Sequence, residues 1–301
     1  MTSRGLSKFY NISTLFLPLF SGTKACLNIT TSVKMTLSGQ TALVTGASMG
    51  IGEATARALA KAGANLIILS RSEDKLSKLT DELSKQHPQI KVIYRTADVG
   101  NYEEVDAAVD SSVKELGGID ILINNAGLAI GAPNAFHNLK ISEIQTMIST
   151  NVNGPMYVAH SVLNRSMIPR KAGTIINVTS VTGLEVPPFT GEAVYHSNKA
   201  AQEAFTNSLR NELSGTNIRV LALRPGVVAG HFHSQRIGHD QAQYDEFMHG
   251  YTPLIAGDVA EAAVYMLNQP LNVSIKALDV VPSAQRSLTV FDRQWNERDG
   301  Q

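Results

Sequence analysis

The sequence predicts an α/β fold, a single doubly wound domain built on a seven-stranded parallel sheet. Two observations support this prediction. From Thr41 onward, apolar runs of strand length alternate with longer stretches that carry apolar residues at three- and four-residue spacing, as in βαβ units. No repeat, low-complexity tract or Pro/Gly/Ser-rich linker divides residues 36–301, so we expect one domain over that range.

The apolar runs place the elements in order. Strands are expected at 41–44, 65–69, 91–96, 120–123, 173–179, 218–223 and 277–281. Helices are expected between them, including 51–62, 73–85 and a stretch from Tyr195 to about Leu213. Residues 231–254 break the alternation and are expected to form an irregular lid.

The composition is that of a globular protein with a small-molecule ligand. Hydrophobic residues make up 43% and charged residues 17% of the 301 residues, which is enough for a sizeable core. Lys and Arg (26) balance Asp and Glu (26), so no summed field favours nucleic acid. The single cysteine, Cys26, cannot form an internal disulfide, which is compatible with a reducing compartment, and we expect a cytoplasmic protein.

Residues 1–35 are predicted to be an extension outside the fold or a targeting segment. They contain four basic residues, whereas the first acidic residue of the chain is Glu53, a pattern typical of a mitochondrial transit peptide. A secretory signal is the weaker alternative, and a start of the protein at Met35 is another. The apolar stretch 15–20 is interrupted by Pro18 and is too short to span a bilayer, so no transmembrane segment is expected.

A glycine-rich turn follows the first predicted strand. Residues 45–52 read TGASMGIG, with Gly46, Gly50 and Gly52 directly before a helix. Glycines at this place let the backbone approach a pyrophosphate, which the unpaired N–H groups of the helix start attract. The turn therefore predicts a Rossmann-type dinucleotide site, and we include the intervening Ser48, Met49 and Ile51 among its residues.

The end of the second strand predicts which dinucleotide binds. A site for NAD normally has an acidic residue there, which accepts a hydrogen bond from the ribose 2′-hydroxyl. This chain has Ser70 and Arg71 instead. A hydroxyl and a guanidinium suit the 2′-phosphate of NADP, so NADP is the expected cofactor.

Tyr195 and Lys199 lie four residues apart at the start of a predicted helix and so share one face. A tyrosine becomes a useful acid or base near neutral pH only if a nearby cation favours its anion, and Lys199 can supply that charge. Ser180 ends a predicted strand fifteen residues upstream, where parallel strands face the ligand crevice. The three residues are therefore candidates for acid–base chemistry.

These motifs together resemble the short-chain dehydrogenase/reductase family. The resemblance extends over most of residues 36–285 and includes Asp98-Val99, the Asn-Asn-Ala-Gly run ending at Gly127, Asn151 and Pro225-Gly226. It implies that Asn151, Ser180, Tyr195 and Lys199 form a catalytic tetrad. It also implies a cofactor site whose further residues are Asp98, Val99, Asn125, Ala126, Gly127, Tyr195, Lys199, Pro225, Gly226 and Val228. A homodimer or homotetramer is expected.

Within that family, the chain is similar to NADP-dependent 3-hydroxy acid dehydrogenases, which oxidise serine and allo-threonine. The similarity lies in RPGVV at 224–228, Phe232, Arg236 and TPLIAGDV at 252–259. It implies hydride transfer between NADP(H) and a carbonyl or secondary alcohol, with a 3-hydroxy acid as one substrate class. A general ketone reductase and a nucleotide-binding protein without turnover remain as alternatives.

Four residues are predicted to line the substrate pocket: Pro187, Phe189, Phe232 and Arg236. The Arg236 guanidinium could clamp a substrate carboxylate bidentately, while the alternative is a solvated surface arginine. His231, His233 and His239 match no helix-borne pair of zinc ligands, and no cysteine is near them in sequence, so no metal site is expected.

Overall fold

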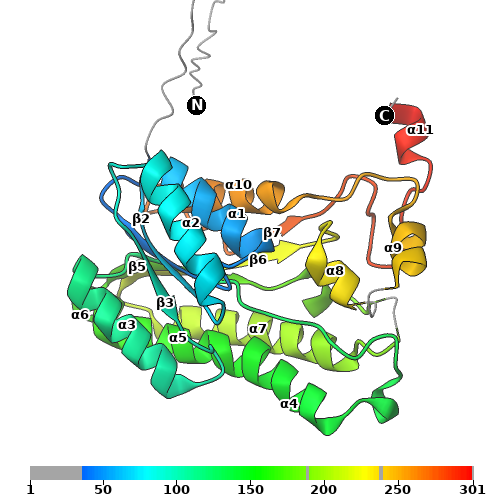
Figure 1. Cartoon of the computed structure of the whole chain (residues 1–301), viewed down its shortest axis with the longest axis horizontal. Helices are drawn as coiled ribbons and strands as arrows, with labels where there is room; N and C mark the ends of the chain where they lie inside the picture. The colour runs from blue at the N-terminus through cyan, green and yellow to red at the C-terminus, as the bar shows by residue number, and fades with distance from the viewer. Residues whose placement is uncertain (1–35, 188–189, 237–239, 300–301) are drawn as a thin grey trace, which may run out of the picture. The chain divides into compact units, whose positions relative to one another are not determined.

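Seven parallel strands form one sheet in this computed structural model, in the order β3-β2-β1-β4-β5-β6-β7 (Figure 1). The structure describes residues 36–187, 190–236 and 240–299; the predicted N-terminal extension, 1–35, lies outside them. The strands are β1 (Thr41–Thr45), β2 (Asn65–Ser70), β3 (Val92–Thr96), β4 (Ile121–Asn124), β5 (Ala172–Val178), β6 (Asn217–Pro225) and β7 (Ala277–Val280). The predicted fold is confirmed, and every predicted strand end lies within two residues of the observed one.

Helices cover both faces of the sheet (Figure 1). One face carries α1 (Gly50–Lys61), α2 (Glu73–Gln86) and α10 (Ala256–Leu267), and the other carries α3 (Tyr102–Leu116), α5 (Gly154–Val162) and α7 (Ala193–Glu212). Successive residues of a strand point to opposite faces, so β1 contributes Val44 to the first core and Leu43 to the second. Both side chains are fully buried, as expected for strands covered on two sides.

Local chemistry fixes the helix ends near the site. Asn101 caps α3 by accepting hydrogen bonds from the backbone N–H groups of Glu103 and Glu104, and Gly117 ends it in the left-handed region at φ 82°. A π-helical turn, Ser149–Asn153, joins α4 (Ile141–Ile148) to α5. This turn carries Asn151, and such turns occur often at functional sites.

The segment predicted to be irregular contains two short helices, α8 (His231–Arg236) and α9 (Gln241–Met248), so the prediction of an irregular structure was wrong. Both helices are too short for their periodicity to stand out in the sequence. The N-terminus of α9 is fixed by Asp240, whose carboxylate accepts a hydrogen bond from the backbone N–H of Gln243 at 3.1 Å.

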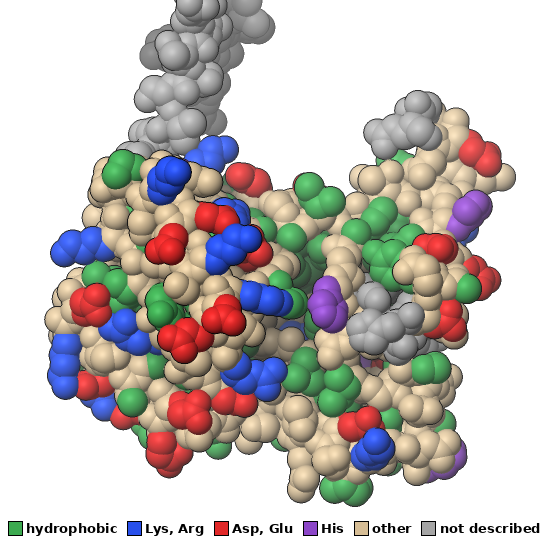
Figure 2. All heavy atoms as spheres, viewed as in Figure 1, with side chains coloured by type: hydrophobic (Ala, Val, Ile, Leu, Met, Phe, Trp, Pro, Cys, Tyr) green, Lys and Arg blue, Asp and Glu red, His purple; other side chains and the backbone are tan. Residues whose placement is uncertain are grey.

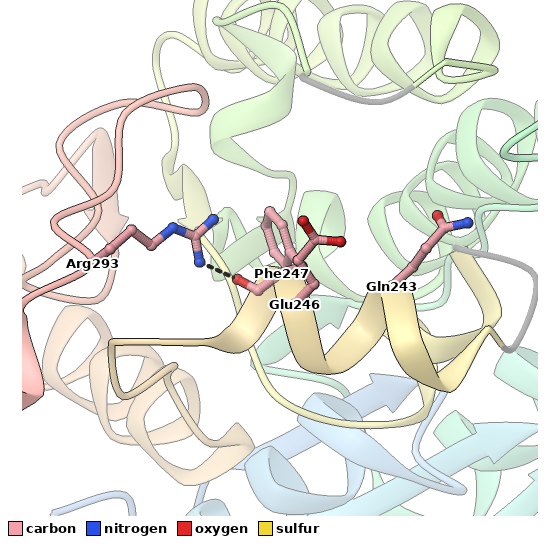
Figure 3. Close-up of a pocket in the computed structure, with 4 residues that line it drawn as sticks. All are labelled: Gln243, Glu246, Phe247 and Arg293. Atoms are coloured by element: carbon pink, nitrogen blue, oxygen red, sulfur yellow. Dashed lines mark hydrogen bonds between the residues drawn. The ribbon is translucent and has the colours of Figure 1, made fainter.

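The chain after β7 returns to α9 and holds it. Arg293 donates to the carbonyl oxygen of Phe247 at 2.6 Å, the contact drawn in Figure 3, and to that of His249 at 3.0 Å. Its guanidinium also lies 5.2 Å from the ring centroids of Tyr251 and Phe291. Cation–π contacts and charge-assisted hydrogen bonds from one arginine therefore fasten α9 to the end of the chain. The last helix described is α11 (Trp295–Asp299).

Charges are interspersed on the face that Figure 2 shows, where basic and acidic side chains alternate over α2 and α3. This distribution agrees with the balanced composition. Among the residues that the structure describes, no helix is long and apolar enough to cross a membrane.

Candidate active site

The site lies at the carboxyl ends of the strands, where the order of the sheet reverses. The chain runs outward from β1 through β2 to β3, and then returns to place β4 on the other side of β1. In open α/β sheets this switch point is where ligands bind. The Thr45 hydroxyl ties the two strand ends together there, accepting hydrogen bonds from the backbone N–H groups of Asn125 at 3.0 Å and Ala126 at 3.1 Å.

Two positions in the turn after β1 admit only glycine because the backbone approaches so closely. Gly46 has φ +65°, and a Cβ there would lie 2.8 Å from the Cα of Ala126. A Cβ on Gly52 would lie well inside van der Waals distance of the Gly46 carbonyl oxygen. The first turn of α1 is thereby held against β1.

The turn fits a dinucleotide diphosphate. Gly50 has φ +60°, and a Cβ there would meet nothing within 4 Å, so no neighbouring atom crowds the first residue of α1. Met49 is exposed and makes no side-chain cap on α1, while Ser48 and Ile51 are half-buried. The N–H groups of the first turn therefore have no capping side chain from Met49 and can bind phosphate oxygens.

The residues expected to bind the adenosine part of the cofactor lie near the ends of the neighbouring strands β2 and β3. Arg71 is largely exposed, and its Nη1 lies 3.6 Å from the carboxylate of Asp98. Ser70 Oγ accepts from the N–H of Ser72 at 3.2 Å. Val99 is buried against Gly154 at the start of α5. The residues predicted to discriminate between cofactors thus lie side by side.

Asn151 is fully buried and fixed by the loop after β4. Its Oδ1 accepts from the N–H of Leu128 at 2.8 Å, and its Nδ2 donates to the carbonyl of Leu128 at 2.7 Å. Gly127 is exposed just before this contact, and a Cβ there would lie 3.3 Å from Asn151 Oδ1 and 3.8 Å from Lys199 Nζ. The loop 125–128 therefore borders both the glycine turn and the predicted tetrad.

Tyr195 is the buried centre of the predicted tetrad. The Lys199 Nζ lies 5.7 Å from the centre of its ring, and the Ser180 side chain is near enough to lower its pKa. Burial raises the pKa of Tyr195 to about 12; the charge of Arg236 and the hydrogen bond with Ser180 oppose this rise. The tyrosine is consequently protonated at neutral pH.

The pKa of Tyr195 is shifted in the direction opposite to the one expected from the sequence. The Tyr–Lys spacing predicts that Lys199 lowers the pKa of Tyr195, but the cost of removing the phenolate from water outweighs the attraction of the Arg236 cation. The same burial lowers the pKa of Lys199 to about 8, against the attraction of Glu203. Spacing shows which groups meet, but not how much water is excluded around them.

Sequence reasoning did not identify Gln202, which links two members of the tetrad. Its Oε1 accepts from Lys199 Nζ at 3.0 Å, and its Nε2 donates to the backbone carbonyl of Asn151. Lys199 also donates to the carbonyl of Val178 at 3.0 Å. Gln202 lies three residues after Lys199, so the shared helix face was a signal that could have found it.

Ser180 lies between β5 and the chain that follows β6. Its Oγ accepts from the N–H of Thr182 at 3.1 Å and donates to the carbonyl of Pro225 at 3.4 Å. Gly226 follows in close contact with Gln285, whose side chain accepts from the N–H of Val227 at 3.0 Å. Val228 continues this path by pairing with Leu254. The predicted Pro-Gly turn therefore borders the tetrad.

Two of the predicted substrate residues lie against Tyr195. The ring centroid of Phe232 is 5.8 Å from that of Tyr195, and the Arg236 guanidinium carbon is 5.4 Å from the tyrosine ring centroid. Pro187 is half-buried in the preceding loop, and Phe189 lies outside the described residues. Arg236 is not a solvated surface arginine, because it is 8% exposed.

Arg236 is paired with an acidic residue that sequence reasoning missed. Its Nε and Nη2 both donate to the two carboxylate oxygens of Glu192, which is 3% exposed. Burial alone lowers the pKa of Arg236, but the hydrogen bonds and the charge of Glu192 raise it above its ordinary value. Glu192 stands three residues before Tyr195, one helical turn away, which is the signal the sequence offered.

No group of three His, Cys, Asp or Glu side chains that could hold a metal ion occurs within the described ranges. Of the three histidines considered, His239 lies outside those ranges and the side chain of His233 is not described.

Comparison with known proteins identifies the family. A model of the short chain dehydrogenase family matches residues 40–241. The chain belongs to this family. It is 37% identical over 243 residues to sulfoacetaldehyde reductase 2 of Chromohalobacter salexigens, covering 81% of this chain and 94% of that one. It is 36% identical over 250 residues to the NADP-dependent 3-hydroxy acid dehydrogenase of Schizosaccharomyces pombe, covering 83% and 95%.

Solved structures of the family superpose on most of this chain. The closed form of a serine dehydrogenase complexed with NADP⁺ has a TM-score of 0.75 and 33% identity, and covers 84% of this chain and 99% of its own. An actinorhodin polyketide ketoreductase with NADPH, carrying a Phe-to-Trp substitution, has a TM-score of 0.73 and 30% identity, covering 82% and 97%. The family therefore includes both hydroxy-acid and ketone chemistry on this fold.

The first prediction concerns the glycine turn. Gly52→Ala places a methyl group against the Gly46 carbonyl and must push α1 away from β1, at a cost of about 1–3 kcal/mol in the free energy of unfolding. We expect a lower melting temperature and weaker dinucleotide binding, measured by thermal denaturation and fluorescence titration.

Gly257→Ala is the matched control, because Gly257 also lies in the first turn of a helix, α10, and its added Cβ would meet Ile255 only at 3.7 Å. Equal effects of the two substitutions would contradict the assignment of the turn as a close-packed cradle.

Proposed function

We propose that this short-chain dehydrogenase transfers hydride between NADP(H) and the carbon of a carbonyl or secondary alcohol, with Tyr195 as the acid–base group. The observation that carries the proposal is the burial of a protonated Tyr195 among Ser180, Lys199 and Arg236. A tyrosine with a pKa of about 12 holds its proton until charge develops on the substrate oxygen, so it acts as the acid in carbonyl reduction.

The neighbouring residues complete the proton chemistry. When bound, NADPH supplies the hydride. Ser180 hydrogen-bonds the same substrate oxygen that Tyr195 protonates. The Lys199 ammonium stabilises the tyrosinate that remains after proton transfer, and Gln202 and Asn151 hold Lys199 in place through the hydrogen-bonded chain described above. The family resemblance also implies that Asn151 orders a proton-relay water.

The cofactor would be held along the carboxyl ends of β1 to β6. The glycine turn and α1 suit the diphosphate, and the loop 125–127 and the turn 225–228 border the tetrad on either side. Arg71 and Ser70 support NADP over NAD, because a largely exposed guanidinium can reach the 2′-phosphate of the ribose. The names of similar proteins that use NADP support the same choice.

A nucleotide-binding protein without turnover is the rival function. The buried tetrad with its hydrogen-bonded chain favours turnover, because burying a tyrosine and a lysine costs stability that nucleotide binding alone does not require. We expect the enzyme to form a homodimer or homotetramer and to act in the cytoplasm. Mitochondrial targeting through residues 1–35 is the alternative, supported by their basic, acid-free composition.

The second prediction tests the acid. Tyr195→Phe removes the hydroxyl and keeps the ring that packs against Phe232. We expect the rate of carbonyl reduction to fall by about 10²–10⁴-fold, while NADPH binding stays within about threefold of the wild type. The measurements are initial rates of NADPH oxidation and a fluorescence titration. A rate near that of the wild type would refute the role of Tyr195.

The third prediction tests cofactor choice. Arg71→Asp reverses the charge that faces the 2′-phosphate, and the loss of a charge-assisted hydrogen bond weakens NADPH binding by about tenfold or more. We expect the ratio of kcat/KM for NADPH to that for NADH to fall accordingly. Arg95→Asp is the control, because Arg95 lies on β3 and pairs with Glu115 on α3. An unchanged ratio in Arg71→Asp would show that Arg71 does not contact the phosphate.

A further inference from the structure

The ion pair between Glu192 and Arg236 joins two elements that meet at Tyr195. Glu192 is the N-cap residue of α7, the helix that carries Tyr195 and Lys199, and Arg236 is the last residue of α8. The pair is bidentate, with Arg236 Nε on one carboxylate oxygen of Glu192 and Nη2 on the other. A carboxylate supplied by the protein therefore occupies the edge of the guanidinium that would otherwise bind a substrate carboxylate in the same geometry.

Because the Glu192–Arg236 pair is buried, a substrate carboxylate cannot easily replace Glu192. Both side chains are at least nine-tenths buried, so water cannot replace either partner. A substrate carboxylate that took over Arg236 would leave Glu192 charged, buried and without its cation, and breaking such a pair costs several kcal/mol. A substrate anion that did not displace Glu192 would meet a pair whose charges cancel.

The pair also lies close enough to the reacting group to influence which substrate is accepted. The Arg236 guanidinium is 5.4 Å from the ring centroid of Tyr195, and Phe232, on the same short helix, is 5.8 Å from that ring. The groups that lie against the Tyr195 ring thus include an aromatic ring and a neutralised ion pair. Such a wall suits an uncharged substrate.

We propose that Glu192 is a specificity-determining residue, which neutralises Arg236 and so directs the site toward uncharged ketones and secondary alcohols and against substrates that carry a carboxylate or sulfonate. This inference rests on the proposed function. It also separates this chain from the similar proteins named for 3-hydroxy acids and sulfoacetaldehyde.

The test uses pairs of substrates that differ in charge and otherwise only by one methyl group. Rates of NADPH oxidation are measured for a panel of β-keto acids and their methyl esters, beginning with acetoacetate and methyl acetoacetate. We expect the wild-type kcat/KM to be about tenfold or more higher for each ester than for its acid, since roughly 1.4 kcal/mol corresponds to tenfold. A wild-type enzyme that uses the acids as well as the esters, or better, would overturn the proposal.

Two variants should change the acid-to-ester ratio in opposite directions, which a general loss of structure cannot do. Glu192→Gln keeps the shape and removes the charge, so the acid-to-ester ratio of kcat/KM should rise by about tenfold. Arg236→Gln should lower the acid-to-ester ratio below that of the wild type, because Glu192 then repels the substrate anion. The double variant Glu192→Gln/Arg236→Gln should return the ratio to near the wild-type value.

Glu185→Gln is the matched control and should leave the ratio unchanged, because Glu185 accepts a hydrogen bond from the backbone of Leu288 and is exposed. Thermal denaturation checks that each variant is folded; if Glu192→Gln is not, the Arg236→Gln and double variants carry the test. Equal changes for acid and ester in Glu192→Gln or Arg236→Gln would overturn the proposal.

A binding measurement separates this inference from the proposed function. Acetoacetate is titrated into each enzyme–NADPH complex, with NADPH fluorescence as the readout. If no member of the panel is turned over, the proposed function fails, but tighter binding of acetoacetate to Glu192→Gln than to the wild type still supports the inference. Equal binding to the two proteins would overturn it.

Discussion

The parallel pairing of β1 with β2 on one side and with β4 on the other decides where every candidate functional residue lies. The register sets Val44 against Ile68 and Ile123, so the three strands end at the same edge of the sheet. The Thr45 hydroxyl joins the end of β1 to the chain after β4 by accepting a hydrogen bond from the backbone N–H of Asn125. The order of the strands reverses at this point, which is where open α/β sheets bind their ligands.

Exclusion of water is the second requirement of the site. Tyr195 and Lys199 are buried next to each other, and burial moves the pKa of the tyrosine up and that of the lysine down, so each favours its neutral form. Hydrogen bonds from Lys199 to Val178 and Gln202 offset part of that cost. The arrangement stabilises a proton on the tyrosine and keeps a cation within reach of it at neutral pH.

Local patterns in the sequence were enough for the sheet and for most of the site. Strand-length apolar runs place all seven strands, and the glycine turn, Ser70-Arg71 and the Tyr–Lys spacing place residues that the structure brings to one edge. Three features could not be predicted this way. The helices α8 and α9 are too short for a clear periodicity. The direction of the pKa shift of Tyr195 and the pairing of Arg236 with Glu192 across 44 residues of chain depend on tertiary burial.

The central claim is that proton transfer depends on a protonated Tyr195 beside a charged Lys199. The most direct test is the pH dependence of kcat/KM for ketone reduction between about pH 5 and pH 10. Lys199 carries its charge below a pKa of about 8 and loses it above, whereas Tyr195, with a pKa of about 12, stays protonated throughout. The account predicts a decline in kcat/KM above a pKa of about 8. A value that stays constant up to pH 10 would contradict it.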